Sequence, residues 1–134
     1  MLKSLAHACF VVADLERSIS FYRDALGLSV AFEFRNDAGQ RSGAYLACGG
    51  RTFLELFTGR PTPPDPNGSY RHISLEVDDL DAAIAGLARA GVKATDKKLG
   101  KDHSWQAWTA DPDGNRIELH QYTPDSLQTK ALGS

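Results

Sequence analysis

Four residues of this chain are of types that bind divalent metal ions, and they form two matching pairs. His7 and His72 lie 65 residues apart, and Glu55 and Glu118 lie 63 residues apart. Two imidazole nitrogens and two carboxylates make a mixed ligand set that suits one Ni, Co, Zn, Mn or Fe ion. Two carboxylates also balance the charge of a divalent ion, and such a site can keep open positions for a substrate. The four residues therefore predict a metal centre that is able to support catalysis.

An internal repeat places the two pairs in equivalent positions. The segment 7–19, HACFVVADLERSI, aligns with the segment 72–84, HISLEVDDLDAAI, with histidine over histidine and Asp-Leu over Asp-Leu. In each copy the apolar run is typical of a buried strand, and the Asp that follows is typical of a helix N-cap. Both glutamates lie in apolar surroundings, where an unpaired carboxylate is costly to bury. A bound cation would offset that cost.

The elements that position these residues follow the same order in both halves. We expect helices over 15–26 and 80–90, which end before Gly27 and Gly91. Turn signals separate the expected strands, which lie near 29–34, 42–47 and 52–57 in the first half and near 92–95, 104–109 and 115–122 in the second. The pattern is βαβββ in each half, and the fold class is α+β.

We expect one domain over 1–134, built from two modules. The first module covers 1–58 and the second covers 70–122. The segment 59–69 between them holds four of the six prolines and is typical of a semi-rigid linker. Each module alone is too small to bury much apolar surface, so we expect the sheets to join each other or a second chain, as in a homodimer. The tail over 123–134 has no apolar periodicity, and its role stays open.

The composition excludes several classes of protein. Of the 134 residues, 42% are hydrophobic and 24% are charged, with a formal net charge of -2, which is typical of a globular protein. The chain has no run of Lys and Arg, no apolar stretch long enough for a bilayer and no complete signal region. The two cysteines form no CxxC pair, as in proteins of a reducing compartment. We expect a cytoplasmic protein with a small-molecule substrate and no nucleic-acid or membrane partner.

Four segments of the sequence resemble the motifs of a known family. They are HACFVVADLERSISFYRDALGL at 7–28, FLEL at 53–56, HISLEVDDL at 72–80 and DPDGNRIEL at 111–119. Over about residues 4–122 the chain resembles the vicinal oxygen chelate superfamily, which includes glyoxalase I, fosfomycin-resistance thiol transferases, extradiol dioxygenases and bleomycin-binding proteins. The resemblance implies the glyoxalase/bleomycin resistance/dioxygenase fold. In that fold two βαβββ modules curl into a cup-shaped half-barrel around the metal, within one chain or across a homodimer.

The ligand set is similar to that of glyoxalase I, whereas the related dioxygenases and thiol transferases typically use three protein ligands. The resemblance thus implies a metal-dependent isomerase or lyase that chelates vicinal oxygens of a small hydroxycarbonyl or 2-oxoaldehyde-derived substrate. A proton would move by way of an enediolate, with Glu55, Glu118 or a bound water as the base. Two alternatives stay open. One is an Fe(II) extradiol-type dioxygenase that uses His7, His72 and Glu118, and the other is a bleomycin-resistance-like protein that binds a drug or metabolite without turnover.

Two positions depart from the glyoxalase I pattern. Four residues after the first metal histidine, that family has an arginine that helps to hold glutathione, and this chain has Val11. Four residues after the second ligand the family has an asparagine, and this chain has Gly59. Both departures argue against glutathione as part of the substrate.

Other residues are candidates for the walls of the substrate pocket. Strand alternation predicts that Gln106 and Trp108 face the cavity, with Trp108 equally compatible with a core role. Cys9 shares the face of His7 and lines the pocket or fills space beside it. His103 and the lysines around it are candidates for binding an anionic group, although loop residues of these types are more often solvated.

Overall fold

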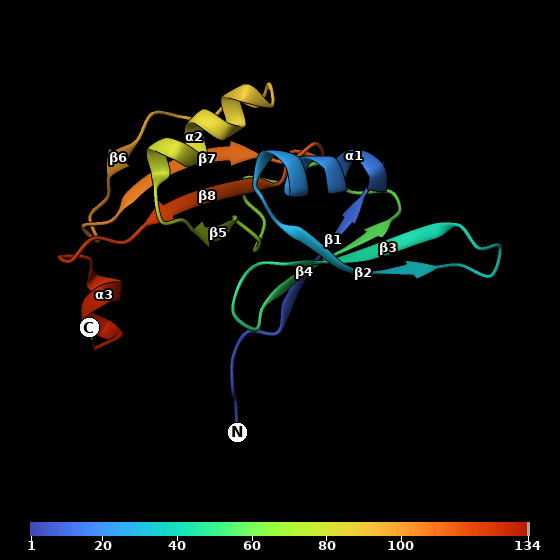
Figure 1. The fold of residues 1–134 in the computed structure, drawn as a ribbon, viewed down its shortest axis with the longest axis horizontal. Helices are drawn as coiled ribbons and strands as arrows, with labels where there is room; N and C mark the ends of the chain where they lie inside the picture. The colour runs from blue at the N-terminus through green and yellow to red at the C-terminus, as the bar shows by residue number, and fades with distance from the viewer. Residues whose placement is uncertain (134) are drawn as a thin grey trace. The chain divides into compact units, whose positions relative to one another are not determined.

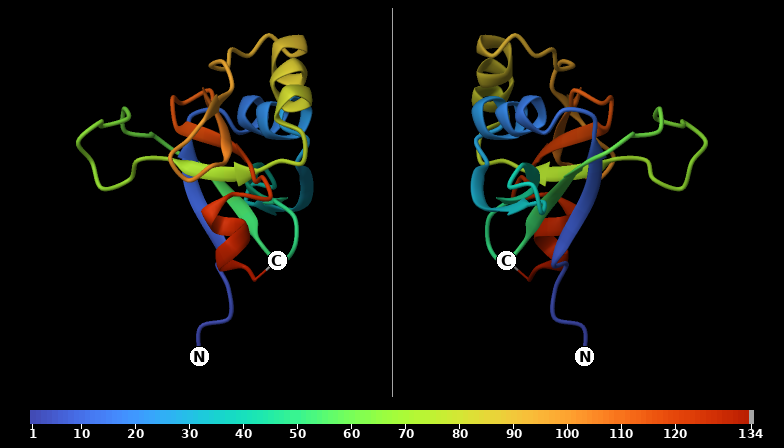
Figure 2. Two further views of the ribbon diagram at one scale, coloured as in Figure 1. Left: turned by 90° about the vertical axis from the view of Figure 1, so that its left-hand side faces the viewer. Right: turned by 90° about the vertical axis from the view of Figure 1, so that its right-hand side faces the viewer.

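The computed structural model describes residues 1–133 and divides into two compact units. The first unit is Met1–Pro63, and the second begins at Pro64. The boundary falls inside the proline-rich segment 59–69, which Figure 2 shows as part of a long irregular loop between the last strand of the first unit and the first strand of the second. Each unit contains one four-stranded sheet with a helix packed on it (Figure 1). The α+β class expected from the sequence is confirmed.

The first unit has the predicted order of elements. They are β1 (His7–Val12), α1 (Leu15–Ser20), the π-helical segment η1 (Phe21–Ala25), β2 (Ser29–Arg35), β3 (Arg41–Ala47) and β4 (Phe53–Thr58). The strand order in the sheet is β1-β4-β3-β2, with β1 parallel to β4 and the other pairs antiparallel. The parallel pairing is the one that brings the first histidine strand beside the first glutamate strand.

The helix of the first unit begins as predicted and changes its winding before it ends. The carboxylate of Asp14 accepts a hydrogen bond from the N–H of Arg17 at 3.1 Å, which caps the helix. From Phe21 onward the turn widens, and the N–H of Leu26 reaches the carbonyl of Phe21 at 3.3 Å. The chain then leaves the helix at Gly27, whose φ of 79° favours glycine.

The second unit repeats this plan with one correction. Its elements are β5 (Ile73–Glu76), α2 (Leu80–Arg89), β6 (Lys98–Leu99), β7 (Trp105–Ala110), β8 (Arg116–Gln121) and α3 (Leu127–Ala131), with the strand order β5-β8-β7-β6. The predicted strand near 92–95 is wrong, because the Thr95 side chain takes the place of part of the ladder. Its Oγ1 accepts from the N–H of Trp108 at 2.9 Å, and the strand β6 forms only at Lys98.

The tail contains a helix that the sequence pattern did not predict. It is α3, which follows β8 and is drawn in red in Figure 1. The N–H of Leu127 donates to the carbonyl of Asp102 at 2.9 Å, so the helix is attached to the loop between β6 and β7. Among residues 1–133, no helix has the length and apolar character needed to cross a bilayer.

Alternation along the strands separates a core face from the face on which His7 lies. In β1, Phe10 and Val12 are buried, while His7, Cys9 and Val11 are exposed on the other face. Burial of apolar side chains of this size contributes about 1.5–3 kcal/mol each. In β8 both faces are buried, because Glu118 and His120 are covered as well as Ile117 and Leu119. The second glutamate therefore lies in a setting where its carboxylate needs partners.

Candidate metal and substrate site

The first unit brings one imidazole and one carboxylate together. In the parallel pair of β1 and β4, Cys9 lies opposite Glu55, and the Glu55 Oε1 reaches back to within 3.4 Å of His7 Nε2. Tyr45 lies opposite Glu55 on β3, and its hydroxyl is 3.4 Å from His7 Nδ1. A partner on Nδ1 orients the ring and directs Nε2 toward the carboxylate, as outer partners do for metal-bound histidines. This nitrogen and oxygen are ligands that a divalent metal takes.

Two further groups surround the Glu55 carboxylate. Partial burial raises the pKa of the Cys9 thiol, and so does its hydrogen bond to Glu55. Burial also raises the pKa of Tyr45, and the negative charge of Glu55 acts in the same direction. Both groups therefore stay protonated near neutral pH and act as hydrogen-bond donors to Glu55. Cys9 lies on the site face, as its parity predicts, and carries no sign of an activated thiolate.

The second unit reproduces the register of the first. In the parallel pair of β5 and β8, Ser74 lies opposite Glu118, as Cys9 lies opposite Glu55. Glu118 is only 7% exposed, and its Oε1 lies 2.8 Å from Ser74 Oγ and 2.7 Å from His120 Nδ1. His72 comes two residues before Ser74. Its ring lies edge-on to the ring of Trp108, with ring centroids 4.7 Å apart. The buried carboxylate is thus held in place by two neighbours.

A polar chain continues behind Glu118. His120 is 8% exposed, and its Nε2 lies 3.1 Å from Asp102 Oδ2. Gln128, on α3, donates to the same Asp102 oxygen at 2.7 Å, and the N–H of Ser104 donates to Oδ1 at 3.1 Å. The bond from Gln128 lowers the pKa of Asp102 most, and Ser104 and His120 lower it further. An ionised Asp102 therefore faces His120, and His120 bridges two carboxylates.

Sequence reasoning missed this chain of side chains. His120 carried a usable signal, because it lies two residues after Glu118 in one strand and so shares its face. Asp102 and Gln128 carried no such signal. Asp102 lies 18 residues before His120 in a loop, and Gln128 lies 8 residues after it in the tail helix. The tail therefore helps to order a predicted metal ligand.

The predicted ligand set is divided between the units. His7 and Glu55 belong to the first unit, and His72 and Glu118 to the second. Among residues 1–133, no three His, Cys, Asp or Glu side chains gather as a single metal-binding group. Each unit nevertheless supplies one imidazole and one carboxylate, and each carboxylate is already oriented by donors. The chemistry of these donors fits a divalent ion.

The predicted pocket residues have different settings. Gln106 and Trp108 lie opposite His120 and Glu118 in the pairing of β7 and β8, so all four share one face of the sheet. His103 instead occupies a turn with a φ of 64°, and its carbonyl accepts from Thr123 Oγ1 at 2.7 Å. The structure thus gives the backbone of His103 a role in the turn and leaves its side chain exposed.

Val11 and Gly59, the two departures from the glyoxalase I pattern, are in contact. Val11 is 45% exposed, and a Cβ added to Gly59 would lie 2.7 Å from Val11 Cγ1. An asparagine at position 59 therefore does not fit beside this valine without a shift. The two departures therefore act as a pair, because Val11 occupies the space that a side chain at position 59 would need.

Aromatic side chains form a wall beside Glu55 that the sequence analysis did not identify. Phe32, which is 46% exposed, stacks on Tyr45 with ring centroids 4.5 Å apart. Phe34 stacks on Phe57 with centroids 5.6 Å apart. The signal was present in the alternation of aromatic residues along β2 and β4. The first unit thus offers an apolar surface next to its imidazole–carboxylate pair.

The chain is similar to known proteins over most of its length. A family model described as the Glyoxalase/Bleomycin resistance protein/Dioxygenase superfamily matches residues 4–119. The chain is 33% identical to glutathione transferase FosA of Serratia marcescens over 123 residues, which are 90% of this chain and 82% of FosA. It is 31% identical to a lactoylglutathione lyase of Neisseria meningitidis serogroup A, over 87% of this chain and 89% of that protein.

A solved structure gives a third comparison. The crystal structure of TnmS3, an antibiotic binding protein from Streptomyces sp. CB03234, superposes with a TM-score of 0.74 at 32% identity. The match covers 91% of this chain and 98% of TnmS3. Similar proteins therefore include named enzymes and a named binding protein.

Proposed function

Because the chain belongs to the Glyoxalase/Bleomycin resistance protein/Dioxygenase superfamily, we propose that it is a divalent-metal-dependent isomerase or lyase of the glyoxalase I-like type. Its substrate is a small hydroxycarbonyl or 2-oxoaldehyde-derived compound with two adjacent oxygens. The observation that carries the proposal is the 3.4 Å approach of His7 Nε2 to Glu55 Oε1. It supports Glu55 as a fourth ligand, which would set this pattern apart from the three-ligand pattern of dioxygenases and thiol transferases.

His7, Glu55, His72 and Glu118 would hold the ion. When bound, the ion supplies a Lewis acid that makes the C–H next to a substrate carbonyl more acidic. Ser74 and His120 fix Glu118 through its Oε1, so Glu118 serves as the constant ligand. Glu55 meets His7 at 3.4 Å, a longer contact than the 2.8 and 2.7 Å bonds of Glu118, and its carboxylate is the base that accepts the proton and returns it to the neighbouring carbon.

The surroundings of Glu55 favour that role. Cys9 and Tyr45 stay protonated beside it and hold the carboxylate in position while it carries charge. The aromatic wall of Phe32 and Phe34 presents a partly exposed apolar surface on one side of this pair. Substrates with an apolar portion next to the two oxygens suit this face.

Metal content and turnover test the proposal together. The full-length protein is stripped with chelator, reconstituted separately with Ni, Co, Zn, Mn or Fe(II), and analysed for bound metal. About one ion per chain is expected, with weaker retention in Glu55→Gln. The same variant is expected to lose isomerisation of hydroxycarbonyl sugars and 2-oxoaldehyde adducts, whereas Glu16→Gln, an exposed control on α1, keeps both. Absence of bound metal under every condition would end the catalytic proposal.

The second candidate is a protein that binds a drug or metabolite without turnover. The similarity to the antibiotic binding protein TnmS3 and the exposed aromatic face of the first unit favour it. A binding protein of this kind keeps its affinity for its ligand when all four candidate metal ligands are replaced. An enzyme of the first kind loses it together with turnover, so the fourfold variant separates the two.

A further inference from the structure

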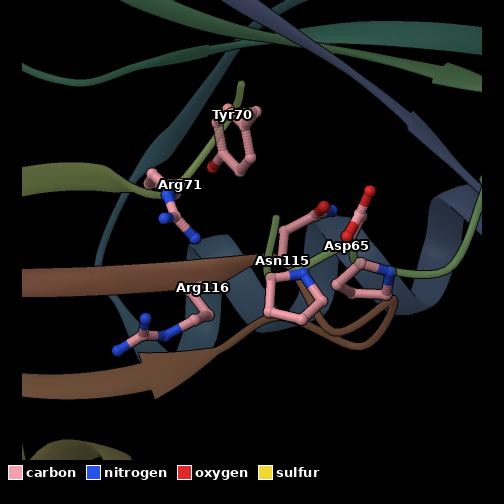
Figure 3. Close-up of a pocket in the computed structure, with 7 residues that line it drawn as sticks. Asp65, Tyr70, Arg71, Asn115 and Arg116 are labelled. Atoms are coloured by element: carbon pink, nitrogen blue, oxygen red, sulfur yellow. The ribbon is translucent and has the colours of Figure 1, made fainter. Parts of the chain in front are cut away.

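We propose that the second unit carries a site for one anionic group of the substrate, a carboxylate, phosphate or phosphonate, bound by Arg71 and Arg116. Both arginines line a pocket of about 170 Å³, together with Tyr70, Asn115, Asp65 and two prolines (Figure 3). The inference rests on the proposed function, because it assigns a charge to the substrate of that site. The binding of an anion can nevertheless be measured without turnover.

The size of the pocket indicates what it holds. Pockets that enclose a whole ligand have volumes of about 300–1,000 Å³. A volume of about 170 Å³ suits a single functional group. Prolines 64 and 66 make this wall stiff, so little ordering is needed when a group enters. The pocket is therefore a subsite for one end of a small molecule.

Neither arginine of the pocket is paired with a carboxylate within residues 1–133. Among the residues that the structure describes, neither Arg71 nor Arg116 has a carboxylate within 4.0 Å, in contrast to Arg23, Arg35 and Arg41. Figure 3 shows the two guanidinium groups on one side of the pocket and the Asp65 carboxylate on the other. Asp65 Oδ1 accepts from the N–H of Asn67 at 2.8 Å and so serves its own loop. An anion between the arginines would relieve their repulsion and accept paired hydrogen bonds.

Arg116 is held in position for this role. Its guanidinium carbon lies 4.4 Å from the centre of the Trp108 ring, which is a cation–π contact. A guanidinium that already contacts an aromatic ring loses less freedom when it binds an anion. Arg116 also lies two residues before Glu118 on β8, and Trp108 contacts the ring of His72. The anion site therefore adjoins the two metal ligands predicted in the second unit.

The test follows the Trp108 indole N–H by NMR while inorganic phosphate is added to the full-length protein at constant ionic strength. We expect a saturable shift, both in protein as purified and after chelation of metal. Arg116→Gln and Arg71→Gln are each expected to weaken the phosphate Kd tenfold or more, which corresponds to about 1.4 kcal/mol. Arg89→Gln, which removes the same charge at the end of α2, is expected to leave the Kd within twofold.

Three results would overturn the proposal. One is the absence of a saturable shift, and another is a Kd that both pocket variants leave unchanged. The third is a shift that disappears on chelation, because phosphate would then be bound by the metal. Failure of the proposed function has a different signature, since protein that binds no metal would still give the phosphate titration and its dependence on Arg71 and Arg116.

Discussion

Replacement of His120 by Asn tests whether the buried chain of side chains holds Glu118. His120 bridges Glu118 Oε1 at 2.7 Å and Asp102 Oδ2 at 3.1 Å, and the shorter Asn side chain cannot span both carboxylates. Hydrogen bonds to charged groups contribute about 1.5–3 kcal/mol each. Ser74 still bonds to Glu118 and Gln128 still bonds to Asp102 in the variant, which moderates the loss. We expect the free energy of unfolding to fall by about 2–4 kcal/mol.

The assay is equilibrium unfolding in urea, with His103→Asn as the matched control. The His103 side chain is exposed, and Asn tolerates the positive φ at that position. The control is therefore expected to change the free energy by no more than about 0.5 kcal/mol. A double-mutant cycle with Asp102→Asn is expected to show a coupling of about 0.5–3 kcal/mol.

Two results would refute this reasoning. If His120→Asn is no more destabilising than His103→Asn, the contacts of His120 do not stabilise the second unit. If His120→Asn is destabilising but additive with Asp102→Asn, His120 contributes through packing alone, and the bridge to Asp102 has no measurable energy.

Three further predictions follow from single contacts. Gly59→Ala is expected to lower the free energy of unfolding by about 1–3 kcal/mol, because the new Cβ would lie 2.7 Å from Val11 Cγ1. Adding Val11→Ala should recover this loss in thermal unfolding, and no recovery would mean that another contact is responsible. Asp79→Ala is expected to lower the free energy of unfolding in urea by about 0.5–2 kcal/mol, because the Asp79 carboxylate caps α2 by accepting from the N–H of Ala82 at 3.0 Å. An unchanged midpoint would contradict the cap. The pKa of Asp102 lies below its ordinary value of 3.8, so its contribution to stability is present above that pH and is lost as the pH falls through the folded pKa. Gln128→Ala removes the main cause of the lowered pKa, so unfolding measured across this range should depend less steeply on pH, and an unchanged slope would count against the bond.

The sequence by itself determined the elements that short-range patterns encode. Asp14 and Asp79 predicted the starts of α1 and α2, because a carboxylate at an N-cap satisfies a helix N–H within three residues. Alternation along β1 predicted that Cys9 shares the face of His7, because successive strand residues point to opposite faces. The repeat predicted that Glu55 and Glu118 occupy equivalent places, and the register opposite Cys9 and Ser74 is indeed the same.

Only the tertiary structure decided the partners of these residues. Asp102 and Gln128 meet His120 from a loop and from a tail helix, and no local period encodes such approaches. The strand predicted near 92–95 does not form, because the Thr95 hydroxyl accepts the hydrogen bond of the Trp108 N–H on β7 that a strand backbone would otherwise take. The contact between Val11 and Gly59 likewise depends on how one strand end lies against another. Periodicity reports which way a side chain faces, whereas its neighbours depend on long-range packing and loop conformation.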